Sequence, residues 1–111
     1  MKVAVVGSRG IELKNLSEYL PEDTTEIISG GAKGVDHAAR SFALTHEIKL
    51  TEYYPDYSRY GRGAPLRRNI RIIEEAELVL AFWDSASRGT KFVIDQCQKR
   101  GIPIRIITME K

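Results

Sequence analysis

The chain has 111 residues, of which 42% are hydrophobic and 29% are charged, and its formal net charge is +2. This length predicts a single domain over residues 1–111, and the composition excludes an intrinsically disordered chain. A charge this small does not by itself indicate a nucleic-acid-binding protein. Binding to an anionic partner would therefore require Lys and Arg side chains that cluster locally.

Cysteine content and apolar patterning narrow the class of protein further. The single cysteine, Cys97, excludes an internal disulfide and a multi-cysteine metal site, and it lies in an apolar helical pattern typical of a core residue. No stretch is long enough to span a bilayer and no signal peptide is present, which predicts a cytoplasmic protein with no membrane partner. No spacing typical of a metal site or a catalytic triad occurs, and we expect neither a metal nor a resident cofactor.

The first half of the chain predicts two strands, each followed by a helix. Lys2–Val6 is a short β-branched run, typical of a strand buried on both faces at the centre of a parallel sheet. A helix is predicted over Glu12–Leu20, where leucines recur at helical spacing before a proline. Thr25–Ile28 is the second predicted strand, and the apolar periodicity of residues 35–43 predicts a helix with one face on the sheet.

The second half continues this alternation. Ile48–Tyr53 predicts a third strand, and its polar character suits the edge of a sheet. The remaining predicted elements are a helix over residues 66–76, a strand over 78–82, a helix over 89–100 that ends before Gly101, and a strand over 102–107.

This order of elements predicts an α/β fold. We expect a single Rossmann-like three-layer domain with a five-stranded parallel sheet, in the strand order 3-2-1-4-5, and helices on both faces. In such sheets, ligands bind outside the carboxyl ends of the strands, where the strand order reverses. The reversal here lies between the first and fourth strands.

Three polar, glycine-containing loops leave the strands at this edge, at residues 7–10, 29–36 and 83–90. Glycine leaves backbone N–H groups accessible, and a helix N-terminus directly after such a loop attracts phosphate. Each loop alone is also typical of a plain turn. Their convergence on one edge predicts a crevice for an anionic ligand.

The loop before the last helix offers two kinds of interaction. Ser87–Thr90 presents hydroxyl and N–H groups to an anion, and Arg88 can pair with a phosphate, although the same residues also form an ordinary helix cap. Asp84 can accept a hydrogen bond from a ribose hydroxyl or can cap the following turn, and both alternatives stay open. His37, at a helix start, is expected on the helix surface rather than as a base.

Four tyrosines alternate with five arginines between Tyr53 and Arg71. The run resembles a base-stacking and phosphate-binding surface, and a solvated loop anchored by aromatic residues is the alternative. We expect Arg67 and Arg68 in the first turn of a helix, where the dipole disfavours cations, which indicates an anionic partner.

Two common nucleotide-binding motifs are missing. The sequence has no Gly-Lys-Ser/Thr phosphate loop, and its first loop, Gly7–Gly10, lacks the full dinucleotide fingerprint. ATP hydrolysis and NAD redox chemistry are therefore not expected.

Four motifs taken in order resemble the SLOG superfamily of Rossmann-like nucleotide-binding proteins. They are Val6–Arg9, Ser29–Asp36, Pro65–Asn69 and Ser87–Thr90, and the resemblance is closest to a small bacterial and archaeal branch whose function is unassigned. The superfamily includes Lonely Guy phosphoribohydrolases and DNA-processing protein A. The resemblance implies that the Gly30 loop and the Gly89–Thr90 helix start hold a phosphate or ribose phosphate.

The resemblance also bears on catalysis. Arg68 stands where the hydrolases have their active-site arginine, but Val93 stands where they have a glutamate near the sugar, and Asp95 is expected on another face of the helix. The catalytic candidates that this leaves are Arg68, Asp84 and Asp36. Without the glutamate, the resemblance favours binding over cleavage.

We therefore expect the chain to bind a nucleotide or a nucleotide-derived ligand. One alternative is N-glycosidic hydrolysis of a nucleoside monophosphate or nucleotide sugar, and another is single-stranded nucleic-acid binding. The resemblance to Lonely Guy proteins leaves a homo-oligomer open. The residues predicted to bind the ligand are Gly7, Ser8, Arg9, Ser29, Gly30, Gly31, Ala32, Gly34, Asp36, Arg68, Asp84, Ser87, Arg88, Gly89 and Thr90.

Overall fold

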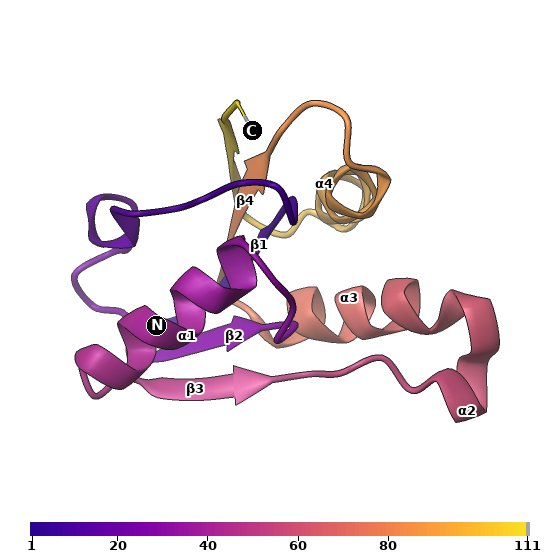
Figure 1. Cartoon of the computed structure of the whole chain (residues 1–111), viewed down its shortest axis with the longest axis horizontal. Helices are drawn as coiled ribbons and strands as arrows, with labels where there is room; N and C mark the ends of the chain where they lie inside the picture. The colour runs from indigo at the N-terminus through magenta and orange to yellow at the C-terminus, as the bar shows by residue number, and fades with distance from the viewer. Residues whose placement is uncertain (111) are drawn as a thin grey trace.

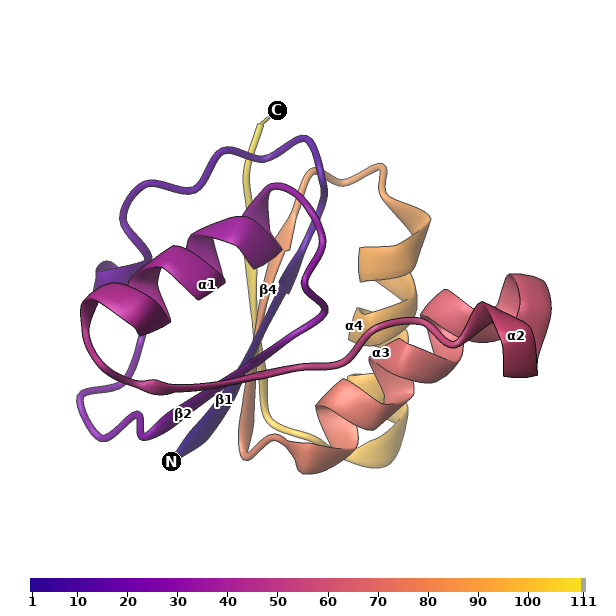
Figure 2. The same ribbon diagram turned by 60° about the horizontal axis from the view of Figure 1, so that its bottom comes forward.

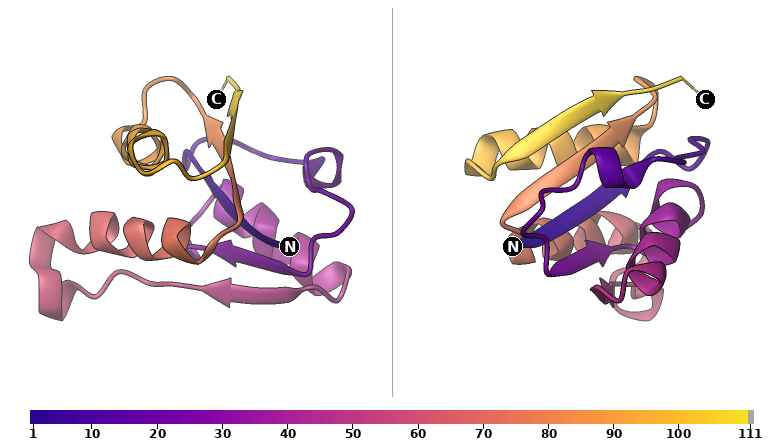
Figure 3. Two further views of the ribbon diagram at one scale, coloured as in Figure 1. Left: turned by 180° about the vertical axis from the view of Figure 1, so that it is seen from behind. Right: turned by 90° about the vertical axis from the view of Figure 1, so that its left-hand side faces the viewer.

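Five parallel strands form one sheet in the order β3-β2-β1-β4-β5, which confirms the predicted topology. The structure is a computed structural model that describes residues 1–110. Strand β1 lies at the centre of the sheet, and β3 and β5 form its two edges (Figure 3). The strands are β1 (Lys2–Gly7), β2 (Glu26–Ser29), β3 (Lys49–Glu52), β4 (Leu78–Trp83) and β5 (Ile104–Thr108).

Helices cover both faces of this sheet, as predicted. Helix α1 lies on one face, and α3 and α4 lie side by side on the other (Figures 1 and 2). Among residues 1–110, no helix combines the length and the apolar character needed to cross a bilayer. The helical elements are η1 (Leu16–Glu18), α1 (Val35–Thr45), α2 (Tyr57–Tyr60), η2 (Gly61–Gly63), α3 (Ala64–Glu75) and α4 (Arg88–Arg100).

The strands bury side chains on both faces, so the molecule has two cores. Under α1, Val3, Val5 and Phe82 pack with apolar residues of the helix and of the loop after β1. Under α3 and α4, the alternate strand residues pack against a second apolar set that includes Cys97. Cys97 is fully buried, as predicted, and burial raises the pKa of its thiol to about 11.

The predicted helix over Glu12–Leu20 is wrong. This segment is a loop with a single 3₁₀ turn, η1 (Leu16–Glu18). Ile11, Leu13 and Leu16 are buried while the residues between them are exposed, so the leucines reach the core from a largely extended backbone. Apolar residues spaced in this way satisfy either conformation, and local spacing alone did not distinguish them.

Two element boundaries also differ from the prediction. Strand β5 begins at Ile104 rather than Ile102, because Pro103 has no N–H to donate to the ladder, although its carbonyl accepts from Val79 N. Helix α3 begins at Ala64 rather than Leu66, which places both Arg67 and Arg68 beyond its first turn, so the helix dipole no longer indicates an anionic partner for either residue.

Gly7 permits the close approach of α1 to the end of β1. A Cβ atom at this position would lie 2.6 Å from Val35 Cγ2 and 2.7 Å from the Phe82 carbonyl oxygen. We expect Gly7→Ala to lower the free energy of unfolding by about 1–3 kcal/mol, the usual cost of overpacking. Urea denaturation measures this change, with Gly63→Ala as the control because a Cβ there contacts nothing within 4 Å. A Gly7→Ala variant as stable as Gly63→Ala would contradict this account of the packing.

Candidate functional site

A crevice of about 400 Å³ opens between the carboxyl ends of β1 and β4, where the strand order reverses. All three predicted loops contribute to its walls, and α3 closes one side. The predicted residues that line it are Gly7, Arg9, Gly30, Ala32, Asp36, Arg68, Asp84, Ser87, Gly89 and Thr90. The predicted residues that do not line it are Ser8, Ser29, Gly31, Gly34 and Arg88.

Ser8 joins the loops that follow β1 and β4. Its backbone N–H donates to the Phe82 carbonyl over 3.0 Å, and its buried hydroxyl accepts from Asp84 N over 3.2 Å. These two bonds fix the base of the crevice. Ser8 therefore has a structural role that is separate from any contact with a ligand.

Side chains of the loop before α4 accept hydrogen bonds from backbone N–H groups of the loop and of the helix start. Asp84 Oδ1 accepts from the N–H groups of Ala86 and Ser87 over 2.9 and 2.7 Å, and Trp83 Nε1 donates to the Ser87 carbonyl over 3.1 Å. Ser87 Oγ accepts from Thr90 N over 3.5 Å. The capping alternatives proposed for Asp84 and Ser87 are both present in the structure.

The first turn of α4 faces the crevice through Gly89. The first N–H groups of a helix have no acceptor within the helix, and they carry the positive end of its dipole. A Cβ atom at Gly89 would meet no atom within 4 Å, so the space in front of this backbone is open. The helix start therefore offers N–H donors to a group that enters the crevice.

Arg68 reaches into the crevice from α3. Its Nη1 donates to the Gly30 and Tyr53 carbonyls over 2.8 and 3.2 Å, and its Nε donates to Asn69 Oδ1 over 2.8 Å. Its Nη2 makes no hydrogen bond with the described residues. The guanidinium is thus held at three points, and its remaining donors are available to a ligand.

Two opposite charges act on Arg68. Burial lowers the pKa of this arginine, the Asp36 carboxylate raises it, and the positive charge of Arg9 lowers it again. Arg9, which lines the crevice from the loop after β1, is therefore close enough for its charge to add to that of Arg68. Two cationic side chains, Arg9 and Arg68, therefore line the same crevice.

Asp36 is a buried carboxyl group at the start of α1. Its Oδ2 accepts from Ala32 N over 3.1 Å, which closes the glycine-rich loop on itself. Burial raises the pKa of Asp36, while the Ala32 N–H, the Arg68 charge and the neighbouring Ser29 hydroxyl lower it, and burial has the largest effect. Asp36 thus shapes the loop as well as lining the crevice.

This pKa shift gives a testable pH dependence. Above the ordinary pKa of 3.8, the folded state retains a proton on Asp36 that the unfolded state has released, so stability falls as the pH rises through this window. We expect Asp36→Asn to be more stable than the wild type at neutral pH, with the difference vanishing as the pH falls towards 3.8.

Urea denaturation between pH 4 and 7.5 measures the effect, and Glu52→Gln is the matched control. The hydrogen bond from Arg40 lowers the pKa of Glu52, so its stabilisation is present above 4.5 and is lost as the pH falls. The two variants should therefore shift stability in opposite directions at neutral pH. An Asp36→Asn variant less stable than the wild type at neutral pH would contradict the assignment.

Gly31 and Gly34 serve the packing of the loop itself. Both have positive φ, and a Cβ at Gly31 would lie 2.6 Å from the Tyr54 ring, while one at Gly34 would lie 2.5 Å from the Arg9 carbonyl oxygen. These contacts explain the two glycines without a ligand. Their predicted role in ligand binding stays a prediction.

Sequence reasoning missed the network that holds Tyr54 against this loop. Arg40 binds Glu52 through two hydrogen bonds of 2.8 and 3.0 Å, and Tyr54 Oη donates to Glu52 over 2.8 Å. The three residues come from a helix, an edge strand and a loop. No local pattern indicates such a pairing.

Beside the crevice lies a second hollow, here called the tyrosine–arginine surface. Arg59 and Arg67 each lie 5.2 Å from the centre of the Tyr60 ring, and Arg71 lies 4.4 Å from that of Tyr53. Arg68 lines both this hollow and the crevice. Three carboxylates, Asp56, Glu74 and Glu75, also line it, and the name refers to its other aromatic and cationic residues, Tyr53, Tyr54, Arg59, Tyr60, Arg67 and Arg71.

The groups that a hydrolase would need are only partly present. Val93 lines the crevice and is 2% exposed, while Asp95 is exposed and pairs with Lys91 on the surface of α4. The carboxyl groups that line the crevice are Asp36 and Asp84, and both accept backbone hydrogen bonds. Within residues 1–110, no three His, Cys, Asp or Glu side chains are grouped so that they could hold a metal ion.

Comparison with known proteins agrees with this architecture. Residues 1–75 match the model of the family described as DNA recombination-mediator protein A, a match that runs from β1 to the end of α3. The gene 61 protein of Mycobacterium phage D29 is 31% identical over 88 residues, which cover 70% of this chain and 67% of that protein. No solved structure matches the chain. The resemblance to the SLOG superfamily is thereby confirmed. The chain belongs to the DNA recombination-mediator protein A family.

Proposed function

We propose that the crevice binds a nucleotide through its phosphate group. The observation that carries this proposal is the convergence of Arg9, Arg68 and the N-terminus of α4 on one crevice at the reversal of strand order. Arginine pairs with phosphate through planar, charge-assisted hydrogen bonds, and a helix N-terminus supplies further N–H donors. The open space at Gly89 lets a phosphate oxygen approach the backbone.

The other walls of the crevice fit the rest of a nucleotide. Its volume of about 400 Å³ lies within the range of sites that enclose small molecules. Pro65, Leu66 and Val93 provide an apolar wall for a base or a sugar ring. Asp84 also lines the crevice, and its carboxylate is proposed to accept from a ribose hydroxyl.

We further propose that the ligand is bound and not cleaved. The hydrolases that the sequence resembles have a glutamate near the sugar where this chain has Val93, and the two carboxyl groups that do line the crevice, Asp36 and Asp84, each accept backbone hydrogen bonds. A test incubates the protein with nucleoside monophosphates and measures release of free base by chromatography. We expect none above the rate without protein, and catalytic release would favour the hydrolase alternative.

Calorimetric titration tests the binding proposal with four compounds: AMP, ribose 5-phosphate, adenosine and inorganic phosphate. We expect AMP to bind most tightly and ribose 5-phosphate to retain much of the affinity, whereas adenosine loses most of it. At 100 times its dissociation constant, AMP should raise the free energy of unfolding by about 2.7 kcal/mol. Adenosine binding as tightly as AMP, or no binding by any of the four, would show that the crevice is not a phosphate site.

A second candidate is that the nucleotide belongs to a single DNA strand. The observation in its favour is that Arg68 lines both the crevice and the tyrosine–arginine surface, so one strand can run from one to the other. Aromatic rings and arginines are the groups on which single-stranded bases stack, and the family's description refers to DNA.

Titration with oligo-dT separates the two candidates. A DNA-binding protein should bind oligo-dT more tightly than dTMP, with affinity that falls steeply as salt rises. Tyr60→Ala should then weaken binding of oligo-dT and leave dTMP unaffected. Equal affinities for oligo-dT and dTMP would exclude the second candidate while leaving the first intact.

A further inference from the structure

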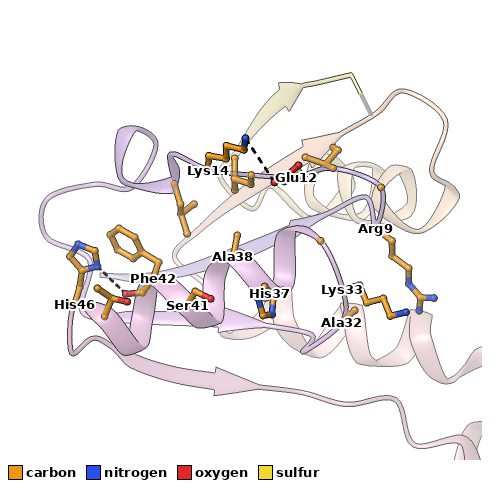
Figure 4. A pocket seen from close by; sticks show the side chains of 16 residues that line it. Arg9, Glu12, Lys14, Ala32, Lys33, His37, Ala38, Ser41, Phe42 and His46 are labelled. Atoms are coloured by element: carbon orange, nitrogen blue, oxygen red, sulfur yellow. Dashed lines mark hydrogen bonds and ion pairs between the residues drawn. The ribbon is translucent and has the colours of Figure 1, made fainter.

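A larger groove, of about 760 Å³, lies between α1 and the loop that follows β1. Figure 4 shows it from close by, with Arg9 and Lys33 at one end and His46 at the other. Among the described residues, Arg9, Gly10 and Ala32 line both the groove and the crevice. The function proposed for the crevice does not use this groove.

The groove exists because the crossover from β1 to β2 contains no α-helix. The three other crossovers carry α1, α3 and α4, whereas this one is a loop with the single turn η1. Ile11, Leu13 and Leu16 of the loop are buried, but the loop does not fill the space beside α1. The groove thus lies where a second helix on this face of the sheet would pack.

The surface of α1 in the groove has the form that packs against another helix. Within α1, the residues that line the groove fall into two rows at four-residue spacing, one with Ala38 and Phe42 and the other with His37, Ser41 and Thr45. Rows spaced in this way form the ridges and grooves into which the side chains of a second helix fit. The two caps of α1, Gly34 and His46, extend the first row at its ends, and Lys33 lies in the loop before the helix.

The charge around the groove is mostly positive. Arg9, Lys14 and Lys33 lie on its rim, and the carboxylate on that rim, Glu12, is 3.9 Å from Lys14 Nζ. The floor is apolar, with Phe42 stacked on His46 at a ring separation of 3.9 Å. An occupant that matches this groove has an apolar stripe flanked by carboxylates.

We propose that this groove binds an acidic amphipathic helix of a partner protein. The helical rows of α1 and the missing crossover helix favour a helix over a compact small molecule, and the cationic rim favours a helix with acidic side chains. Apolar residues of the partner at helical spacing would lie on Phe42 and Leu13, with Asp or Glu side chains facing Lys14 and Lys33.

Selection from a displayed library of randomised 16-residue helical peptides tests the proposal. We expect the selected peptides to share an apolar stripe with flanking acidic residues. Selection against a Lys14→Glu, Lys33→Glu double variant should instead enrich Lys and Arg at the flanking positions. Selected peptides without acidic residues, or no selected peptide at all, would overturn the proposal.

Fluorescence anisotropy with one selected peptide then locates its site. Ser41→Tyr fills the groove without changing its charge and should weaken binding by at least about tenfold, as blocking a central contact does. Leu44→Tyr is the matched control, because Leu44 is 69% exposed on the same helix and does not line the groove.

If the Ser41→Tyr variant bound the selected peptide as tightly as the wild type does, the assignment of the site would be wrong. It would also be wrong if the groove bound the dye 1-anilinonaphthalene-8-sulfonate but no peptide. If Ser41→Tyr impairs folding, Lys33→Glu replaces it, because Lys33 is exposed and its substitution does not disturb the core. This variant should also weaken binding of the acidic peptide. The affinity for AMP should be the same in Ser41→Tyr as in the wild type, so this result stands apart from the function proposed for the crevice.

Discussion

Arg68→Met is expected to weaken the binding of AMP by about 100-fold, because charge-assisted hydrogen bonds contribute about 1.5–3 kcal/mol each. Methionine keeps an unbranched apolar side chain but removes the charge and all the donors of the guanidinium group. It also removes the bonds to the Gly30 and Tyr53 carbonyls, so some loss of stability accompanies the loss of affinity. Calorimetric titration measures the affinity, and thermal denaturation measures the stability.

Two further variants separate charge from geometry. Arg68→Lys retains the charge without the planar set of donors and should fall between the wild type and Arg68→Met. Arg67→Met removes a neighbouring charge that lies outside the crevice and should bind AMP nearly as the wild type does. If Arg67→Met and Arg68→Met weakened binding equally, the effect would be one of general charge and not of the crevice.

Gly89→Ala is expected to change stability and binding in opposite directions. Alanine within a helix is more stable than glycine by about 0.5–1 kcal/mol, and a Cβ here meets no atom within 4 Å. The same methyl group would occupy the space through which a phosphate approaches the N-terminus of α4. We therefore expect a more stable protein that binds AMP at least about tenfold more weakly, a loss of about 1.4 kcal/mol.

The control for this prediction is Gly101→Ala at the other end of the same helix. Gly101 has φ of +71° in the left-handed C-cap position, so alanine there should destabilise the fold and leave AMP affinity unchanged. Urea denaturation measures the stability of each variant, and calorimetry measures its affinity for AMP. A Gly89→Ala variant with wild-type affinity would exclude close contact between the ligand and this backbone.

The fold was predictable because the central strands are apolar runs buried on both faces, as in Val3–Val6 and Leu78–Phe82. Such runs indicate parallel strands whatever their partners are, and the alternation with helices then limits the topology. The helix predicted over Glu12–Leu20 was wrong because the spacing of its leucines fits a loop that reaches the core as well as a helix. That choice depends on tertiary packing, which local spacing does not encode.

The position of the crevice was also predictable, since the topology brings the three loops to one edge of the sheet. The roles of single residues were less so. Gly31 and Gly34 accommodate Tyr54 and the Arg9 carbonyl, and Arg68 is fixed by the Gly30 carbonyl, 38 positions away along the chain. These contacts join distant parts of the sequence, so only the folded arrangement reveals them.

The most direct test of the account is a titration of ¹⁵N-labelled protein with AMP, followed by amide chemical shifts. If the phosphate binds in the crevice, the largest shifts should occur at Gly89 and Thr90 in the first turn of α4 and at Gly30 opposite them. Unchanged signals from these amides, with the largest shifts at His37 and Ser41 in the groove along α1, would contradict the assignment of the crevice as the nucleotide site.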